Sequence, residues 1–227
     1  MVKPRHSSVS AIFLLVAAGL LASGCDSHKA APPRAAPATP APQPALPPTP
    51  PAVVAPLPDW KADPATLERL APYYRIEGYE LRPPASWVIA DATSVGAKIL
   101  AWTGPDRDDG PGPLFCVITE APPPQHEKEI REATLDTIMD QAASQLPKAF
   151  SNVQCIGASK RSGKVNGIPF MRADFTLRHG ARDLRAVLLA GKDGSTVLAM
   201  WFIDAPSTYE ETVKLGEAAM LTFRRKQ

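Results

Sequence analysis

The fold of this chain is decided by residues 171–190, MRADFTLRHGARDLRAVLLA. Two segments within it, 171–177 and 184–190, can pair as antiparallel strands across the turn at residues 179–182. In that register apolar residues face each other on one side, as Leu177–Leu184, Phe175–Ala186, Ala173–Leu188 and Met171–Ala190. The other side pairs Arg178 with Asp183 and Thr176 with Arg185. A slip of one residue would bury these charges, so the sequence predicts this register.

The next strand extends the same sheet. Asp193-Gly194 is typical of a type I′ turn, which joins two antiparallel strands. This turn places four apolar residues on the apolar side of the hairpin, namely Val197, Ala199, Trp201 and Ile203. The alternate positions are apolar too, at Leu198, Met200 and Phe202. A strand that is apolar on both sides indicates that the sheet has a covering layer on each face.

Two amphipathic helices can supply those layers. Residues 129–146 have apolar side chains at intervals of three and four, which predicts one long helix. Near the end of the chain, residues 207–210 (STYE) have the pattern of a capping box. The helix that they open would carry an apolar stripe at Tyr209, Val213, Gly216, Met220 and Phe223. We therefore expect an α+β domain in which an antiparallel β-sheet is sandwiched between helices, an α/β/α arrangement.

Shorter elements precede this core. Asp63-Pro64 is typical of a helix N-terminus, and a short helix should follow over residues 65–70. Strand-like runs follow at residues 87–89, 98–103 and 114–120. The loop at residues 104–113 is rich in Asp, Gly and Pro.

Several short patterns in this order resemble the PsbP-like superfamily. They are GYELRPPASW at residues 78–87, the long middle helix, the turn NGIP at 166–169 before the meander, and the terminal helix near Phe223. That superfamily includes the extrinsic PsbP subunit of photosystem II, bacterial lipoproteins of the DcrB type and a nuclear Ran-binding protein. The resemblance covers about residues 76–225. It implies an α/β/α sandwich that acts as a binding or assembly accessory, and it brings no catalytic residue.

The N-terminus has the features of a bacterial lipoprotein signal. Lys3 and Arg5 precede an uncharged run at residues 11–21, and LASGC at residues 21–25 matches a lipobox. A run of eleven residues is too short to span a bilayer, which requires roughly 20 helical residues. We therefore expect residues 1–24 to be a lipoprotein signal peptide and Cys25 to carry the lipid, on the periplasmic or cell-surface side of a membrane.

Residues 25–58 are predicted to be a tether. The 28 residues from Ala31 to Pro58 include twelve prolines, so this part should be an extended polyproline II segment that spans up to roughly 85 Å. The globular PsbP-like domain should then occupy residues 59–227. It contains 21 Lys and Arg against 22 Asp and Glu, a balance that gives no indication of nucleic-acid binding.

The reactive side chains of the domain form no recognisable catalytic motif. Cys116 and Cys155 lie in strand-like segments, and they can either form a disulfide or pack as buried free thiols. His126 and His179 lie where solvated residues are expected. Residues 157–164 do not match the spacing of a phosphate-binding loop, and the acidic residues at 106–109 do not match a calcium loop. The sequence therefore predicts no catalytic residue, no metal site and no cofactor.

We expect a membrane-anchored, non-enzymatic envelope lipoprotein that acts as a binding or assembly accessory module for an envelope protein. The alternatives are a small-ligand carrier or sensor, with an apolar pocket between sheet and helix, and an envelope hydrolase. Three aromatic residues near the tether, Trp60, Tyr73 and Tyr74, would form a docking patch if they are exposed together. The alternative is that they seal the edge of the sheet or staple the first short helix.

Overall fold

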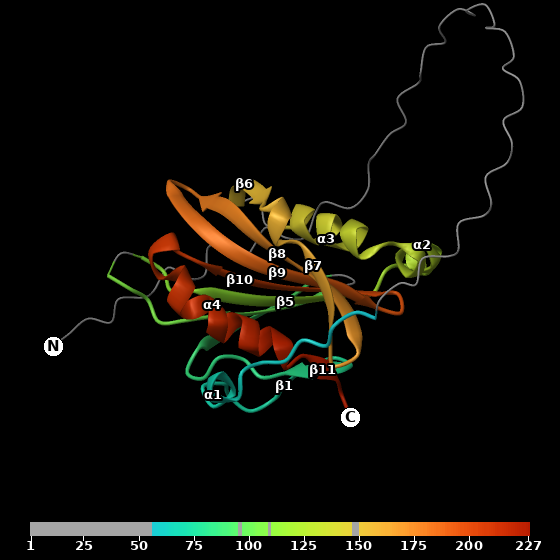
Figure 1. The fold of residues 1–227 in the computed structure, drawn as a ribbon, viewed down its shortest axis with the longest axis horizontal. Helices are drawn as coiled ribbons and strands as arrows, with labels where there is room; N and C mark the ends of the chain where they lie inside the picture. Colours follow the sequence, from blue (N-terminus) through green and yellow to red (C-terminus); the bar gives the residue numbers. More distant parts are fainter. Residues whose placement is uncertain (1–55, 95–96, 109, 147–149) are drawn as a thin grey trace, which may run out of the picture. The chain divides into compact units, whose positions relative to one another are not determined.

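An eight-stranded antiparallel sheet organises the computed structural model, which describes residues 56–94, 97–108, 110–146 and 150–227 (Figure 1). The strands lie in the order β3-β4-β5-β10-β9-β8-β6, and β7 pairs with β8 beside β6. Their bounds are β3 Val88–Ser94, β4 Ala97–Thr103, β5 Leu114–Glu120, β6 Phe150–Cys155, β7 Arg161–Val165, β8 Ile168–His179, β9 Arg182–Asp193 and β10 Thr196–Asp204. The predicted signal peptide, Cys25 and nearly all of the predicted tether lie outside the described residues.

The predicted register of the central meander is confirmed. Leu177 lies opposite Leu184 and Arg178 opposite Asp183 between β8 and β9, as the alternation required. Both turns differ from the prediction. His179 pairs with Arg182, so the first turn is shorter than the predicted four residues. Asp193 pairs with Thr196, so it belongs to the strand and not to the second turn. The second hairpin therefore turns at Gly194 and residue 195, one position later than expected.

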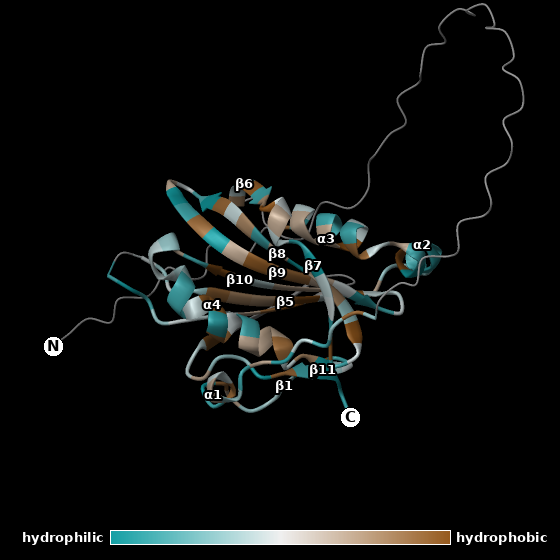
Figure 2. Ribbon diagram, viewed as in Figure 1, coloured by the Kyte–Doolittle hydropathy of each residue, from teal (hydrophilic) through white to brown (hydrophobic). Residues whose placement is uncertain are grey.

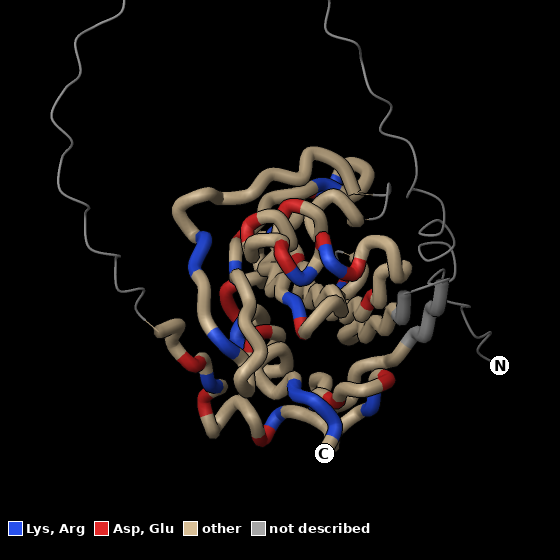
Figure 3. Tube along the Cα trace, turned by 90° about the vertical axis from the view of Figure 1, so that its right-hand side faces the viewer, with Lys and Arg blue, Asp and Glu red and all other residues tan. Residues whose placement is uncertain are grey.

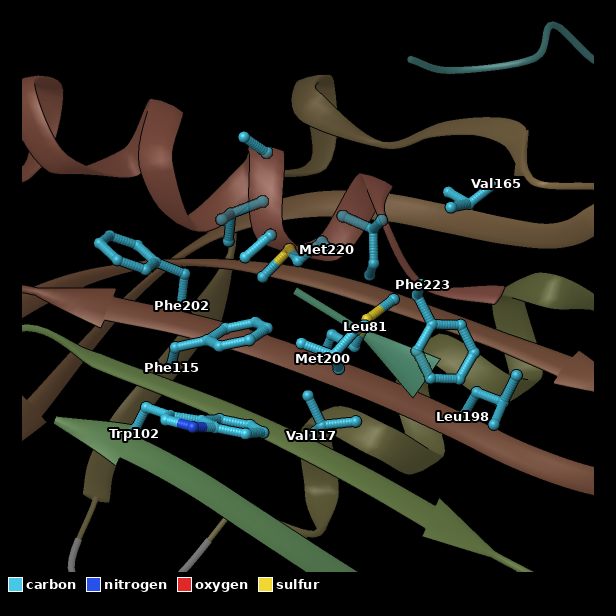
Figure 4. Close-up of a cluster of buried hydrophobic side chains, with 14 of the residues drawn as sticks. Leu81, Trp102, Phe115, Val117, Val165, Leu198, Met200, Phe202, Met220 and Phe223 are labelled. Carbon is cyan, nitrogen blue, oxygen red and sulfur yellow. The ribbon is translucent and has the colours of Figure 1, made fainter. Parts of the chain in front are cut away.

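Both faces of the sheet are covered, as β10 predicted. On one face, α4 (Pro206–Leu221) packs over residues such as Met200 and Phe202, together with Trp102, Phe115 and Phe223 (Figure 4). On the other face lie α2 (Glu127–Glu132) and α3 (Leu135–Ser144), whose apolar side chains join Phe175, Leu188 and Trp201. The central strands are hydrophobic along most of their length in Figure 2. The α+β class and the layered arrangement are therefore observed.

Close contact between α4 and the sheet depends on Gly216. A β-carbon at this position would lie 2.1 Å from Cδ2 of Phe202, whose side chain is fully buried. The glycine in the predicted apolar stripe thus allows the helix to approach the aromatic layer.

The start of α4 differs from the predicted capping box. The N-cap residue is Ala205, and Ser207 makes no capping hydrogen bond. The carboxylate of Asp204, at the end of β10, accepts hydrogen bonds from the Ala205 amide and from the hydroxyls of Thr208 and Thr212. The last residue of the strand therefore binds the N-cap amide and two threonine hydroxyls of α4, which the STYE pattern could not indicate.

The predicted long helix at residues 129–146 is in fact two helices. The chain leaves the helical conformation at Ala133, and Thr134 caps α3 by accepting a hydrogen bond from the Thr137 amide. Lys192 of β9 donates hydrogen bonds to the carbonyl oxygens of Ile130, Arg131 and Ala133. The carbonyl groups at the C-terminus of α2 thus bind the Lys192 ammonium group. A positive charge is favourable there, because a helix C-terminus carries a partial negative charge.

A second, three-stranded sheet lies at the end of the domain that contains the described C-terminus (Figure 1). Its strands are β1 (Tyr74–Ile76), β2 (Tyr79–Leu81) and β11 (Arg224–Arg225), in the order β1-β2-β11. The sequence did not predict it. The short helix α1 (Pro64–Leu67) precedes it, with Asp63 as the expected N-cap. Two short 3-10 turns complete the described elements, at Pro124–His126 and Gly157–Ser159.

Candidate functional site

The three-stranded sheet presents a row of charged side chains. Arg75 of β1, Glu80 of β2 and Arg224 of β11 are direct cross-strand neighbours, so their side chains share one face. Arg224 donates to one oxygen of Glu80 at 2.8 Å from Nε, while Glu80 is largely buried. Arg75 is exposed, and no ion pair is recorded for it among the described residues. The row therefore has an excess of positive charge.

Two tyrosines lie next to this row, Tyr73 on the same side and Tyr74 on the opposite side of β1. Tyr73 is 42% exposed, and the guanidinium carbon of Arg224 lies 4.0 Å from the centre of its ring. Tyr74 is 38% exposed, and it packs edge-on against Trp102 with ring centres 5.6 Å apart. The buried Trp102 thus fixes one tyrosine and Arg224 contacts the other.

Ile89 continues the surface onto the large sheet. It lies opposite Trp102 in the pairing of β3 with β4 and is 40% exposed. Tyr74 and Ile89 are therefore neighbours of the same indole. We call these five residues, Tyr73, Tyr74, Arg75, Ile89 and Arg224, the tyrosine–arginine surface. It has two sides, because Tyr73, Arg75 and Arg224 lie on one side of β1, while Tyr74 and Ile89 lie on the other side, beside Trp102. Tyrosine and arginine are enriched in the contact regions of protein interfaces, because they combine apolar area with hydrogen-bonding groups.

Trp60 does not belong to this surface. Its ring packs so closely on Gly163 of β7 that a β-carbon there would lie 2.2 Å from the indole. The Trp60 amide donates to the carbonyl of Lys164 at 2.8 Å, and Lys164 donates to the carbonyl of Pro58 at 2.7 Å. Tyr73 and Tyr74 are exposed, whereas Trp60 packs on β7, so the three aromatic residues are not exposed together and a docking role for the tyrosines stays a prediction.

Asp193 joins the two sheets. Its carboxylate accepts from Arg225 of β11 at 2.6 Å and from the hydroxyl of Tyr79 at 3.1 Å. The hydrogen bond from Arg225 lowers the pKa of Asp193, and burial, with Asp193 as a second cause, raises the pKa of Tyr79 to about 12. The Asp193 carboxylate, which links β2 and β11 to the large sheet, therefore stays charged at neutral pH.

The candidate disulfide between Cys116 and Cys155 is not formed, and both thiols are free. Cys116 lies on β5 and Cys155 on β6, and three strands separate them in the sheet. Four strand spacings of about 4.8 Å place them roughly 19 Å apart, whereas a disulfide requires Cα atoms within about 7 Å. Burial raises the pKa of Cys116 to about 12, and burial also raises the pKa of Cys155. Neither thiol has the lowered pKa of a reactive cysteine.

The other candidate residues are not brought together. His126 contacts only Glu129 in a turn, and the ring of His179 lies beside Phe150 at the far end of the sheet. Within the described ranges, no three His, Cys, Asp or Glu side chains form a possible metal site. Residues 157–159 form a 3-10 turn and residues 161–165 form β7, so the glycine-containing segment is a strand and turn as expected. Asp109 lies outside the described residues.

A buried ion pair lies at the start of α4. Asp204 is 3% exposed, and Arg107 donates to its two carboxylate oxygens at 2.7 and 3.0 Å. Burial raises the pKa of Asp204, but the hydrogen bonds from Arg107, Thr212 and the Ala205 amide outweigh it, so the net pKa is lowered. These groups satisfy one another, which indicates a structural role for the cluster.

In the described part of the chain, no helix is both long and apolar enough to span a bilayer.

Comparison with known proteins extends the picture of the fold. No protein-family model and no curated protein matches the chain. Among solved structures, it is similar to a Pseudomonas aeruginosa protein of unknown function described as a candidate regulator, with a TM-score of 0.45 and 14% identity over 70% of this chain and 99% of that one.

Two further structures are similar at the same level. The cyanobacterial PsbP protein of Synechocystis has a TM-score of 0.41 and 14% identity over 80% of this chain and 99% of its own. LpqN of Mycobacterium tuberculosis, a protein involved in cell envelope biogenesis, has a TM-score of 0.40 and 8% identity over 75% and 99% of the two chains. A PsbP protein is thus among the structural neighbours, as the sequence resemblance led us to expect. Likenesses this distant carry no argument about activity, which has to come from the site.

Proposed function

We propose that this protein is a membrane-anchored, non-enzymatic lipoprotein of the cell envelope that acts as a binding or assembly accessory module. In this proposal residues 1–24 are removed as a signal peptide, Cys25 carries the lipid, and the proline-rich tether holds the domain on the periplasmic or cell-surface side.

The observation that carries the proposal is the tyrosine–arginine surface. Tyr73, Tyr74 and Ile89 are three of the few large apolar side chains that are exposed in the described residues. Tyr73 contacts Arg224, and Tyr74 and Ile89 both lie beside Trp102, whereas the free thiols and histidines lie apart from one another. Exposed apolar groups that cluster with arginine are typical of a contact surface.

The first experiment tests contact through this surface. A photoreactive amino acid replaces Tyr74 in the full-length protein, expressed in its own cells, and the control carries it at Lys214, an exposed residue of α4. We expect a discrete adduct from position 74 and none from position 214. The same adduct pattern at both positions would refute a binding role for the surface.

The second experiment tests the anchor. The Cys25→Ser variant should lose metabolic labelling with palmitate and should move from the membrane fraction to the soluble fraction. Unchanged membrane association and labelling would contradict lipid attachment at Cys25.

A further inference from the structure

The two edges of the eight-stranded sheet are protected to different degrees. At one edge β7 pairs with the end of the tether, because Lys164 exchanges backbone hydrogen bonds with Pro58 and Trp60. At the same edge β6 has an irregular register between Ser151 and Gln154. Covers and irregularities of this kind keep an outer strand from pairing with another chain. This edge is therefore unsuited to the addition of a strand.

The opposite edge is formed by β3, which lacks these protective features. Its seven residues, VIADATS, include neither proline nor lysine, and its register with β4 is continuous from Val88 to Ser94. In the part of the chain that the structure describes, β3 pairs with β4 alone. Alternate N–H and C=O groups of an outer strand point away from the sheet and can pair with another extended strand. The edge at β3 is thus open to an additional strand.

Exposed apolar side chains lie at the start of this strand. Val88 is 70% exposed and Ile89 is 40% exposed, and they lie on opposite sides of the sheet. Ile89 shares its side with Tyr74, since both lie beside Trp102. A strand added at β3 would therefore cover apolar area on both sides of the sheet, besides pairing with the backbone.

The sequence of β3 is suited to pairing with a second copy of itself. In an antiparallel register centred on Ile89, this residue lies opposite its counterpart, and Val88 lies opposite Ala90, so uncharged residues meet on both sides. Registers centred on Ala90 or Asp91 would place Asp91 opposite Ile89 or opposite a second Asp91. Like charges directly opposite each other are destabilising. The pattern therefore favours a two-fold pairing about Ile89.

The charge and the attachment of the domain also favour a second copy. The domain has 21 Lys and Arg against 22 Asp and Glu, and Figure 3 shows the two kinds interspersed along the described chain. Two copies therefore do not repel each other strongly. Under the proposed lipid anchor, copies on tethers of equal length reach the same heights above one membrane, which raises their effective concentration. A soluble partner has no such advantage.

We propose that β3 pairs with β3 of a second copy in an antiparallel, two-fold dimer that joins the two large sheets into one. This inference deepens the proposed function, on which it rests, because it names a second copy as the partner of one side of the tyrosine–arginine surface. Tyr74 and Ile89 of the two copies form the contact on that side. The protected edges at β6 and β7 stop further strand addition, so the assembly closes as a dimer.

Cysteine crosslinking of the full-length protein, in the membranes of its own cells, tests the pairing. Ile89→Cys is introduced together with Cys116→Ala and Cys155→Ala. Directly opposite residues have Cα atoms about 4.5–5.5 Å apart, within the range of a disulfide. We expect oxidation by copper phenanthroline to give a disulfide-linked dimer. The control Ile156→Cys, in the same background, places a thiol just after β6, where the isoleucine is also 40% exposed, and should stay monomeric. Equal dimer yields at the two positions, or no dimer at position 89, would overturn the inference.

A charge at the edge provides a second test. Ile89→Lys places two ammonium groups opposite each other in the dimer. It should abolish the dimer adduct that a photoreactive amino acid at Tyr74 forms, whereas Ile156→Lys should leave this adduct unchanged. The two isoleucines are equally exposed, so neither variant should unfold the domain. Loss of the adduct in both variants, or in neither, would contradict pairing through β3.

The identity of the Tyr74 adduct separates this inference from the proposed function. An adduct of the chain with itself in the membrane fraction supports both. An adduct with a different envelope protein, together with no dimer at position 89, refutes the inference and leaves the proposed function intact. The absence of any adduct refutes both.

Discussion

Replacing Asp204 with alanine should destabilise the domain strongly. The carboxylate accepts two hydrogen bonds from Arg107 and further ones from Ala205, Thr208 and Thr212. Removal of one partner of a buried ion pair costs about 3–5 kcal/mol, and here the Ala205 amide and the hydroxyls of Thr208 and Thr212 also lose their acceptor. Arg107 retains 22% of its side-chain exposure, so water can partly replace the carboxylate. We therefore expect a loss near the lower limit, about 3 kcal/mol in the free energy of unfolding.

Urea denaturation at pH 7, followed by tryptophan fluorescence, measures this loss. The control is Asp183→Ala, which removes the exposed partner of Arg178 and should cost less than about 1 kcal/mol. Because the pKa of Asp204 is lowered in the folded state, its contribution is present above the ordinary aspartate pKa and declines as the pH falls below it. The difference between wild type and Asp204→Ala should therefore shrink between pH 7 and pH 3. A loss at pH 7 no larger than that of Asp183→Ala would refute this reasoning.

Three further predictions concern other parts of the fold. Gly216→Ala should lower stability by about 1–2 kcal/mol in thermal denaturation, because overpacking against the buried Phe202 ring outweighs the gain of about 1 kcal/mol in helix propensity. Lys192→Met should cost about 2 kcal/mol in urea denaturation and should speed hydrogen exchange in α2, since three carbonyl groups lose an ammonium donor. In the native protein at pH 8, iodoacetamide should modify Cys155, whereas Cys116, whose pKa burial raises to about 12, should react only after unfolding.

Each of these has a control and an outcome that contradicts it. The control for Gly216 is Gly157→Ala, which should change stability little because no atom lies within 4 Å of the added β-carbon. Equal changes in stability in the two variants would contradict the packing argument. The control Lys214→Met removes an exposed ammonium from α4. If it lowered the free energy of unfolding as much as Lys192→Met does, the argument for the hydrogen bonds of Lys192 would be wrong. Equal alkylation rates of the two native thiols would contradict the protection expected for the partly buried Cys116.

The sequence was informative where side chains on paired strands constrain one another. Leu177 and Leu184 can face each other only if Arg178 and Asp183 do so as well, and the two strands are adjacent in the chain. The same locality revealed Asp63 as an N-cap and both faces of β10 as apolar. These features each depend on residues within about 15 positions of each other, so they can be read from one sequence.

The errors arose where a distant residue decides the local structure. Thr134 interrupts a regular apolar pattern because it caps α3, and Lys192 binds the carbonyl groups that this break leaves free. The disulfide could not be judged without the order of the strands, which places β10, β9 and β8 between the cysteines.

The candidate surface was predictable only in part. Tyr73 and Tyr74 stand out as adjacent aromatic residues near the tether, but Arg224 reaches Tyr73 from the other end of the domain. Strands as short as β1, β2 and β11 carry too little periodicity to be recognised. No local pattern could therefore have placed Glu80 between two arginines.

The junction at Trp60 has a mechanical consequence. Under the proposed lipid anchor, any tension in the proline-rich segment reaches the fold through the two hydrogen bonds with Lys164 and the indole that packs on Gly163. The load therefore falls first on the outer strand β7 and reaches the central strands only after β7.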